Sequence, residues 1–525
     1  MRVLALDGVD QQGLNILEKA GLEVTSHATM DEEQLKEVIR DYEALIVRSG
    51  TRVTAPVIMA GKKLKIIGCA GVGTDNIDIS TASEKGIVVA NAPEGNTVAA
   101  VEHTIAMMLA LARNIPQANS NLKQGIWERK KYIGVELRGK TLGIIGLGRI
   151  GREVARRARG LEMKVMAYDP YVDSEQAERL GVELVPLKVV LKEADFITVH
   201  LPLTKDTRHL LGKEQLKLLK PEARVLNVAR GGIIDEEALY EALKSGNLAG
   251  AAIDVFEEEP LTSSPLFELD NVIVTPHLVA STEEAQRAVA LEVAKDILRC
   301  LNGEPVRNAV NIPVIRGHLA KVLHPYLNLA EKLGGFLGQL MESPILTIEI
   351  CCNGELAQYD LAPITNYVLK GLFRPRLGND VNYVNAPLIA RKRGIRIREK
   401  KSRDMDYYAN LITIEVKGRR ESHKLAGTVN PEGTPYIVNL NGYSVHASPS
   451  SHMLVVLHLD RPRLVGPVAM VVGDQEVNIA EMQVGRQEKG GEAVMLMNID
   501  SEVPREALQE IRQVDGVLDV RYICL

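Results

Sequence analysis

Three glycines at a strand-to-helix turn constrain this chain more than any other feature. Residues 141–160 read TLGIIGLGRIGREVARRARG, where Gly146, Gly148 and Gly151 form a G-x-G-x-x-G pattern between an apolar run and a helical pattern. The first glycine of such a turn allows a tight bend, the second lets a pyrophosphate approach the backbone, and the third lets the helix pack on the strand. Free N–H groups at the start of the helix then attract the pyrophosphate. The stretch therefore predicts a dinucleotide-binding unit.

A carboxylate follows this turn at the spacing that a dinucleotide requires. The next apolar run, MKVMAYD, ends in Asp169, which lies eighteen residues after Gly151. A carboxylate at this place accepts hydrogen bonds from the ribose hydroxyls of NAD and repels a 2′-phosphate. No arginine follows in DPYVD. The sequence therefore predicts NAD, rather than NADP, as the cofactor.

The chain of 525 residues is too long for one hydrophobic core. Short apolar runs alternate with helical stretches over residues 1–95, and a second such series begins at residue 141, which indicates two parallel α/β layers. Two long helical patterns bracket the second series, so the chain is expected to leave the first domain and to return to it. We expect a Rossmann-type domain over residues 96–282, inserted in a domain made of residues 1–95 and 283–309.

The pattern of the sequence changes twice more after residue 309. Residues 310–450 combine a long helix with an apolar stripe and a set of mixed strands, which predicts an α+β domain. Residues 451–525 show the order strand, helix, strand, strand, helix, strand of the ferredoxin-like motif. The chain is therefore expected to have four domains.

Charge and cysteine content argue against several classes of function. The formal net charge is −5 and no long basic block occurs, so the electrostatic footprint of a nucleic-acid-binding protein is missing. The five cysteines form no C-x-x-C pair and no ligand spacing with histidine, which argues against a metal site. No apolar run reaches the length of a bilayer span, and the first residues turn polar too early for a signal peptide. We expect a cytoplasmic protein that does not bind a membrane.

Three ionisable residues stand at or just beyond successive predicted strand ends. Arg230 closes the run RVLNVAR, Glu259 follows AAIDVF by three positions, and His277 closes NVIVTPH. Ligands of open parallel sheets bind beyond the carboxyl ends of the strands, so these side chains are candidates for catalysis. Taken singly, Arg230 and Glu259 also fit surface salt bridges, and His277 also fits a core histidine. As a set, they fit a catalytic site in which each residue has a separate role.

The set suits the transfer of a hydride from a carbinol carbon. Histidine titrates near neutrality and can take the hydroxyl proton, which suits His277. A carboxylate favours the imidazolium that forms, which suits Glu259, and a guanidinium grips an α-carboxylate with two hydrogen bonds, which suits Arg230. His200 also ends a strand but has no carboxylate close in sequence, so we expect a structural or cofactor-side role for it. His103 lies within a long helical pattern, which favours packing.

At this point the sequence resembles a known family. The motifs GLGRIGREVARR, NVARGGIIDEEAL, AAIDVFEEEP and VIVTPHLVAST resemble, in order and spacing, the NAD-dependent D-2-hydroxyacid dehydrogenases over the first 310 residues. The segments IVRSGT, AGVGTDNIDI, NAPEGNTVAAVEHT and WERKKYIGVELRGKTLGI, with the two added domains, resemble the long-type phosphoglycerate dehydrogenases of this family nearly end to end. The resemblance implies a flavodoxin-like substrate domain, an intervening domain of the allosteric substrate-binding type and a terminal ACT domain.

The resemblance also implies an activity and an assembly. The implied reaction is the NAD-dependent oxidation of D-3-phosphoglycerate to 3-phosphohydroxypyruvate, the first step of L-serine biosynthesis. The implied assembly is a homotetramer, and the implied effector of the ACT domain is L-serine.

Site residues carry over from the resemblance position by position. The implied catalytic set is Arg230, Glu259 and His277. The implied NAD contacts, besides Arg230, His277 and the three glycines, are Arg149, Ile150, Asp169, Val228, Asp254 and Val72. For the substrate, Arg48 is the first candidate for the phosphate, Ser49 and Gly71 are further candidates, and Arg129 and Lys131 of the ERKK run form a second basic set. The implied serine-binding residues are His458, Asp460 and Asn478.

The chain departs from the pattern of the family at three positions. Val279 stands where relatives have glycine beside the nicotinamide, and Cys69 stands where a basic residue often precedes the family's AG. Arg463 replaces the glycine of the usual D-R-P-G turn of the ACT domain. These departures bear on the cofactor, the phosphate and the effector, respectively.

Two other functions use the same fold. A glyoxylate or hydroxypyruvate reductase, or a 2-oxoglutarate reductase, would carry the same three catalytic residues, but such relatives usually stop after the catalytic half. A corepressor that senses NAD, similar to the C-terminal-binding proteins, would also keep them. The ACT-like tail favours feedback control of metabolism over both alternatives.

Overall fold

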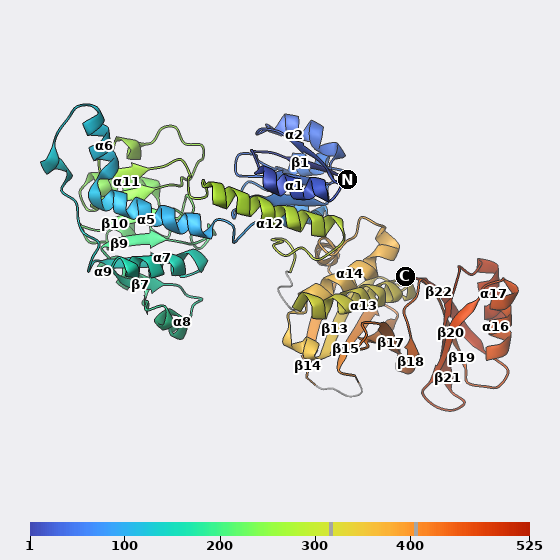
Figure 1. Cartoon of the computed structure of the whole chain (residues 1–525). Helices are drawn as coiled ribbons and strands as arrows, with labels where there is room; N and C mark the ends of the chain where they lie inside the picture. The colour runs from blue at the N-terminus through green and yellow to red at the C-terminus, as the bar shows by residue number, and fades with distance from the viewer. Residues whose placement is uncertain (314–318, 404–407) are drawn as a thin grey trace.

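The computed structural model describes residues 1–313, 319–403 and 408–525. These residues form four β-sheets, here called the first to the fourth sheet in chain order. The second and the fourth sheets lie at opposite ends of an elongated molecule, and the first and third lie between them (Figure 1). Within the described ranges no single helix is long and apolar enough to cross a membrane. Helices α5 (Thr97–Arg113) and α6 (Ile115–Lys123) pass that test only as a pair, and they meet at a bend of 63°.

The first sheet is parallel, with the strand order β2-β1-β3-β4-β5 that flavodoxin-like folds share. Apart from the edge strand β2, whose sequence EVTS is polar and not buried, its strands are buried on both faces, which explains their largely apolar sequences. The strands are β1 (Arg2–Ala5), β2 (Glu23–Ser26), β3 (Ala44–Val47), β4 (Ile66–Cys69) and β5 (Val88–Ala90), and the helices are α1 (Gln11–Lys19), α2 (Glu32–Val38), α3 (Ala55–Ala60) and α4 (Ile79–Glu84).

Helix α12 (Glu283–Leu301) packs against the first sheet beside α1, although it follows the second sheet in the chain (Figure 1). Two glycines make this contact possible. A Cβ atom on Gly13 of α1 would lie 2.7 Å from the carbonyl carbon of Ala290, and one on Gly68 of β4 would lie 2.4 Å from Cγ1 of Val293. The helix therefore belongs to the core of the first sheet.

The second sheet is also parallel, with the order β12-β11-β10-β9-β6-β7-β8. Numbered from β6, this is the doubly wound order of Rossmann folds with one further strand, so the predicted Rossmann-type fold is confirmed. Its strands are β6 (Thr141–Ile145), β7 (Lys164–Tyr168), β8 (Glu183–Leu184), β9 (Phe196–Val199), β10 (Arg224–Asn227), β11 (Gly250–Ile253) and β12 (Val272–Val274). Its helices are α5 (Thr97–Arg113), α6 (Ile115–Lys123), α7 (Arg149–Gly160), α8 (Ser174–Arg179), α9 (Leu187–Glu193), α10 (Lys213–Leu216) and α11 (Glu236–Lys244).

The third sheet has the order β14-β13-β15-β16-β17-β18, in which only the β13–β14 pair is parallel. Helices α13 and α14 pack together on one face and form its core. The elements are α13 (Leu319–Leu340), β13 (Ile345–Gly354), α14 (Ala362–Leu377), α15 (Ala386–Lys392), β14 (Arg396–Ser402), β15 (Asn410–Gly418), β16 (Ser422–Val429), β17 (Pro435–Leu440) and β18 (Tyr443–Ala447). The predicted α+β class is confirmed.

The fourth sheet is antiparallel, with the order β20-β21-β19-β22, as the ferredoxin-like prediction requires. Leu454 and Val456 face its two helices, whereas Met453 and Val455 pack into the core of the third sheet. The C-terminal unit is therefore covered on both faces. Its elements are β19 (His452–Leu459), α16 (Val465–Asp474), β20 (Ile479–Arg486), β21 (Glu492–Ile499), α17 (Arg505–Gln513) and β22 (Val517–Cys524).

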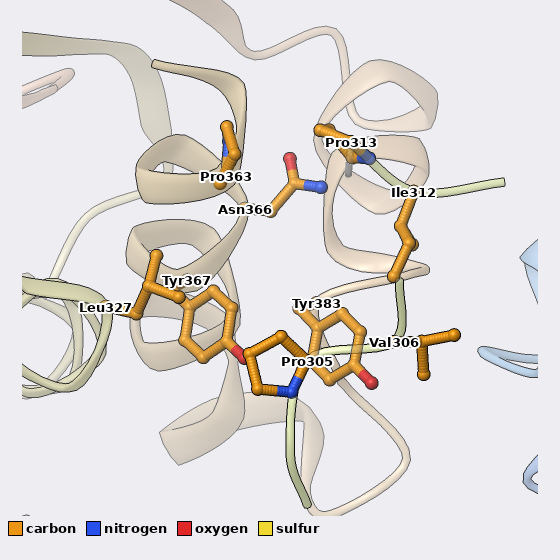
Figure 2. Close-up of a pocket in the computed structure, with 9 residues that line it drawn as sticks. All are labelled: Pro305, Val306, Ile312, Pro313, Leu327, Pro363, Asn366, Tyr367 and Tyr383. Atoms are coloured by element: carbon orange, nitrogen blue, oxygen red, sulfur yellow. The ribbon is translucent and has the colours of Figure 1, made fainter. Parts of the chain in front are cut away.

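The third sheet is fastened to the first through the segment before α15. Val384 enters the core of the first sheet, and the side-chain amide of Asn382 donates to the carbonyl of Gly86 at 2.8 Å. The rings of Tyr367 and Tyr383 stack at a centroid distance of 5.4 Å beside a small apolar pocket at this junction (Figure 2). The cavity of about 30 Å³ has room for water but not for a small-molecule ligand, so the junction is structural.

Candidate active site

The glycine turn has the geometry that a pyrophosphate cradle needs. Gly146 has φ +97°, and a Cβ atom there would lie 2.5 Å from the carbonyl oxygen of His200. A Cβ atom on Gly151 would lie 2.1 Å from the carbonyl oxygen of Gly146, so α7 packs as closely as glycine permits. Gly148 caps α7 and has no atom within 4 Å of its Cβ position. The turn therefore has open space at the glycine where a cofactor's phosphates can approach, and the residues present fit a dinucleotide.

Asp169 lies directly after β7 and is tied to the same turn. Its Oδ2 accepts from the N–H of Leu147 at 2.8 Å, and its Oδ1 accepts from the N–H of Tyr171 at 2.9 Å. No arginine pairs with this carboxylate within the described residues. The carboxylate is held at the edge of the cradle, in the position expected for a ribose ligand.

Three further residues predicted for the cofactor lie close to the cradle. Arg149, the first residue of α7, donates to the carbonyl of Pro93 and lies 3.6 Å from Glu94. Ile150 packs beside a small apolar cluster that contains Val228, Val279 and Ala100. Val279, which stands where relatives have glycine, is thus buried between α5 and the end of β10.

His277 and Glu259 are in direct hydrogen-bond contact. Nδ1 of His277 and Oε2 of Glu259 are 2.6 Å apart, and each side chain is about one-third exposed. Oε1 of Glu259 accepts from the N–H of Phe256 at 2.9 Å. Burial raises the pKa of Glu259, but the hydrogen bonds from His277 and Phe256 outweigh it and hold the pKa below its usual range. Glu259 is therefore a fixed carboxylate that orients the imidazole.

Asp254 holds the loop that carries His277. It is completely buried, and it accepts hydrogen bonds from the hydroxyl of Thr275 at 2.5 Å and from the N–H groups of Leu278 and Val279. Burial acts to raise the pKa of Asp254, but hydrogen bonds from His103, Thr275 and Leu278 lower it overall. The carboxylate thus fixes the backbone on both sides of His277, which itself has φ +52°.

His103 differs from its predicted packing role. Its Nε2 lies 3.2 Å from Oδ1 of Asp254 and 3.4 Å from the hydroxyl of Thr275. Helical periodicity places a residue on the buried face of α5 but does not reveal a polar partner from β11, so the sequence offered no signal for this contact. The imidazole of His200, in contrast, has one hydrogen-bond partner in the part of the chain that the structure describes, the hydroxyl of Thr198 at 3.0 Å.

Arg230 extends from the end of β10 toward the loop after β4. Its Nε donates to Oδ2 of Asp75 at 3.2 Å, and its Nη1 donates to the carbonyl of Ala229 at 2.7 Å. A Cβ atom on Gly73 would lie 2.3 Å from Nη2, so a side chain there would displace the guanidinium. The contact joins the first sheet to the second.

The other substrate candidates follow β3 and β4. Arg48 is anchored by its backbone, since its N–H donates to Asp7 and its carbonyl accepts from Asn76. Ser49 is exposed, and Gly71 and Val72 are half-buried in the loop after β4. The thiol of Cys69 donates to the carbonyl of Gly73, and burial raises its pKa to about 12. Cys69 therefore supports the loop as a neutral thiol.

Arg129 and Lys131 lie away from this cluster within one chain. Lys131 is 3.6 Å from Asp270, which precedes β12, whereas His277 follows β12. The basic run is thus at the amino ends of the strands, opposite the edge that carries the other residues. Both basic side chains are exposed, as is Trp127 beside them.

The predicted effector residues are not brought together within one chain. Asp460 follows β19 and accepts from Arg486, the last residue of β20, and from the N–H of Gly490, which together lower its pKa. Asn478 precedes β20 and donates to Asp500. Because β20 spans residues Ile479–Arg486, the two side chains lie at opposite ends of a strand roughly 25 Å long. His458 is buried, and its Nε2 has no hydrogen-bond partner among the described residues.

The described residues contain no group of three His, Cys, Asp or Glu side chains that could hold a metal ion. What the geometry provides is an imidazole with an oriented carboxylate, a guanidinium and a phosphate cradle. Together these can bind a 2-hydroxyacid and remove a proton from its hydroxyl group.

Three protein-family models match consecutive parts of the chain. They are the NAD-binding domain of D-isomer specific 2-hydroxyacid dehydrogenases at residues 105–279, the D-3-phosphoglycerate dehydrogenase intervening domain at residues 322–441, and the ACT domain at residues 452–516. These matches confirm the predicted cofactor domain and the order of the last two domains.

Curated relatives match the whole chain. D-3-phosphoglycerate dehydrogenase of Methanocaldococcus jannaschii is 46% identical over 526 residues and covers 100% of both chains. The enzyme of the same name from Bacillus subtilis is 42% identical, over 100% of this chain and 99% of its own length.

Among solved structures, the TT0316 protein of Thermus thermophilus has a TM-score of 0.56 and 35% identity, over 59% of this chain and 100% of its own. D-lactate dehydrogenase of Escherichia coli has a TM-score of 0.54 and 29% identity, with the same coverage. These structures correspond in extent to the catalytic half, whereas the curated relatives extend over the two added domains as well. The chain therefore belongs to the D-3-phosphoglycerate dehydrogenase family, the NAD-binding D-isomer specific 2-hydroxyacid dehydrogenases that carry an intervening domain and an ACT domain.

Proposed function

We propose that this chain oxidises D-3-phosphoglycerate to 3-phosphohydroxypyruvate with NAD, the first step of L-serine biosynthesis. The observation that carries the proposal is the 2.6 Å contact between His277 and Glu259 at the strand ends that also present Arg230 and the glycine cradle. The reaction is the one named for its full-length relatives. The limits of the domains proposed for it are 1–95 with 283–309, 96–282, 310–450 and 451–525.

The chain's own residues supply binding and proton transfer. The cradle of Gly146, Gly148 and Gly151 would hold NAD, which would supply an acceptor for the hydride on C2 of the substrate. Nδ1–H of His277 donates to Glu259, which leaves Nε2 free to take the hydroxyl proton, and the carboxylate stabilises the imidazolium that results. Removal of the hydroxyl proton and loss of the hydride leave a C2 carbonyl, and no metal is needed to balance the step.

The remaining cofactor contacts belong to residues that border the cradle. Asp169 takes the ribose hydroxyls, and the residues around the nicotinamide and phosphates are Arg149, Ile150, Val228, Asp254 and Val72. Arg230 grips the carboxylate of the substrate with two hydrogen bonds. Arg48, Ser49 and Gly71 lie on the facing loops of the first sheet and are proposed to hold the rest of the substrate, with Arg48 nearest in role to the phosphate.

Arg129 and Lys131 can take part only if a second copy brings them to a site. Trp127 is 75% exposed and Ile133 80% exposed in the same segment, and Leu122 and Ile115 are more than half exposed on α6. Large apolar side chains gathered on one protrusion favour an interface between copies. We therefore propose a homo-oligomer, a tetramer as in the resemblance, with this segment reaching a neighbouring subunit.

L-serine is the proposed effector of the ACT domain. β20 is an edge strand of the fourth sheet, and antiparallel pairing of two such edges across a two-fold axis would place Asp460 of one subunit beside Asn478 of the other. Asp460 would then pair with the ammonium of serine and Asn478 would hydrogen-bond its polar groups, with His458 beneath. Arg463 has φ +63°, so the turn keeps the backbone that glycine would favour, and its cation is free to approach the carboxylate of the ligand.

A cytoplasmic location is proposed from the free cysteines, since all five lack a disulfide partner.

The test of the function is an assay of NAD reduction with D-3-phosphoglycerate against glycerate, glycolate, D-lactate and 2-hydroxyglutarate. The expected result is a preference for D-3-phosphoglycerate in kcat/KM of at least about 10²-fold, because a bound phosphate adds charge-assisted hydrogen bonds. A preference for glycolate, glycerate or 2-hydroxyglutarate would instead favour the reductase alternatives, and no turnover with any of them would favour the corepressor-like one.

A further inference from the structure

The contact between Asp75 and Arg230 has no assigned role, and it crosses between two sheets. Asp75 lies in the loop after β4 of the first sheet, and Arg230 follows β10 of the second. The carboxylate of Asp75 is 70% exposed, and the guanidinium of Arg230 is 26% exposed. An ion pair so open to water contributes little to stability. Its value must lie in what it does to Arg230.

The loop that presents Asp75 is fixed by hydrogen bonds on both sides. The side-chain amide of Asn76 donates to the carbonyls of Arg48 and Thr51 at 2.7 and 2.6 Å. The amide of Asn91 donates to the carbonyl of Val72 at 2.6 Å, and the thiol of Cys69 donates to the carbonyl of Gly73 at 3.0 Å. Asp75 is therefore a carboxylate held at a set position.

The contact uses only one edge of the guanidinium. A guanidinium has five N–H donors, of which Nε–H goes to Asp75 and one N–H of Nη1 goes to the carbonyl of Ala229. One N–H on Nη1 and both on Nη2 remain. The end-on pair, one donor from each Nη, is the fork that a carboxylate takes with two parallel hydrogen bonds. Asp75 thus accepts a hydrogen bond from Nε and from neither of the Nη groups that form this fork.

We propose that Asp75 is a positioning residue, which anchors Nε of Arg230 across the gap between the two sheets so that the end-on fork of the guanidinium faces the substrate's carboxylate. Gly73 completes the arrangement, since a Cβ atom there would lie 2.3 Å from Nη2. The inference rests on the proposed function only in that Arg230 binds a 2-hydroxyacid. It deepens that function by assigning to the first sheet a part in orienting a catalytic group of the second.

The test is a double-mutant cycle of Asp75→Asn and Arg230→Lys in the full chain. Asp75→Asn removes the charge and keeps the size of the side chain. We expect KM for D-3-phosphoglycerate to rise about tenfold and kcat to change by less than about threefold, because a misplaced fork weakens substrate binding more than proton transfer. In the Arg230→Lys background, Asp75→Asn should have almost no further effect, since lysine lacks the Nε–H that Asp75 holds.

Three controls separate this role from a structural one. Asp41→Asn removes an exposed ion pair with Lys63 outside the strands of the first sheet and should leave KM, kcat and Tm unchanged. Asp75→Asn should leave Tm and the Kd of NAD unchanged. Asp75→Glu should have a KM between those of the wild type and of Asp75→Asn. The exposed side chain has room to extend, and its carboxylate can still reach Nε.

Each contrary outcome overturns the proposal. A lower KM in Asp75→Asn would mean that Asp75 competes with the substrate for Arg230, and an equal effect in the Arg230→Lys background would mean that it acts elsewhere. Failure of the proposed function looks different. If the wild-type chain prefers another 2-hydroxyacid in the substrate panel, the same cycle is run with that acid, and Asp75 is judged on it.

Discussion

The proposed catalytic cluster of the second sheet and the proposed effector residues of the fourth sheet are built in opposite ways. Arg230, Glu259 and His277 come from the ends of β10, β11 and β12, which run side by side in the same direction, so one chain brings them together. Asp460 and Asn478 flank strands that also run in the same direction, but one follows its strand and the other precedes its strand. Strands that run in the same direction bring two residues to one edge of the sheet when both residues follow their strands. They keep the residues apart when one follows its strand and the other precedes its strand. A site made from Asp460 and Asn478 therefore needs two chains, whereas the proposed catalytic site needs one.

The largest expected effect breaks the single-chain site. His277→Ala should lower kcat by about 10²-fold to 10⁴-fold, because the base acts in the transition state, while the Kd of NAD stays nearly unchanged. Stopped-flow turnover and a fluorescence titration of NADH measure the two quantities. Co-expression of His277→Ala with Glu259→Gln chains should not restore turnover, since no chain then holds an intact pair. Near-normal turnover of His277→Ala together with its loss in His200→Ala would move the base to His200.

The second expected effect concerns the two-chain site. Asp460→Ala and Asn478→Ala should each raise the serine concentration for half-inhibition by about tenfold or more, because each removes a charge-assisted or direct hydrogen bond to the ligand. Hybrids of the two variants should regain part of the inhibition, since each interface keeps one site with both side chains intact. Following NADH formation against serine concentration measures this. Hybrids no more sensitive than the parent variants, or a wild-type chain that serine does not inhibit, would remove the proposed two-chain site.

Cofactor choice sharpens the same comparison, because Asp169 and the glycine turn share one chain. Asp169→Asn keeps an oxygen for the N–H of Leu147 but removes the charge that repels a 2′-phosphate. We expect KM for NAD to rise about tenfold and the preference for NAD over NADP to fall by a larger factor. Initial rates with both cofactors give the ratio. If the ratio does not move, another group reads the ribose.

The smallest expected effect is on stability and involves His200. Burial lowers the pKa of His200 to about 4, below its ordinary value of about 6.5. Between these two pH values the unfolded chain binds a proton at His200 that the folded chain does not bind. The free energy of unfolding therefore falls as the pH falls from about 6.5 toward 4, by at most about 1.4 kcal/mol per pH unit. The Tm of His200→Gln should fall less than the Tm of the wild type between about pH 7 and pH 5. An equal loss in both proteins would show that His200 does not set the acid response.

Much of the fold and part of the candidate site could be predicted because they depend on local patterns. The turn combines a positive φ at Gly146 with close contacts at Gly146 and Gly151 that a side chain would prevent, so its conformation could be predicted from its sequence. The catalytic candidates could be predicted for a related reason. Residues that follow apolar runs in a parallel sheet share one edge, whatever the details of the packing.

Other contacts could not be predicted, because they join segments without a common pattern. Asp75 meets Arg230 across 155 positions of the chain, and His103 meets Asp254 across two elements that periodicity describes only singly. The distance between Lys131 and His277 also depends on which end of β12 each segment reaches. Such contacts follow from the docking of loops, and loop sequences vary with little effect on the elements they connect.

The sequence by itself determined the strand-turn-helix units, the NAD-binding domain, the four-part order and the residue types at the strand ends. These features follow from backbone geometry and from charge, which act over a few residues. Only the tertiary structure decided that α12 packs on the first sheet, that Asp254 and Glu259 together fix His277, and that Asp75 reaches Arg230. It alone separated Asp460 from Asn478 and placed Lys131 at the opposite end of β12 from His277. The physical reason is that packing between sheets depends on the shapes of whole surfaces, in which each residue contributes one contact among many.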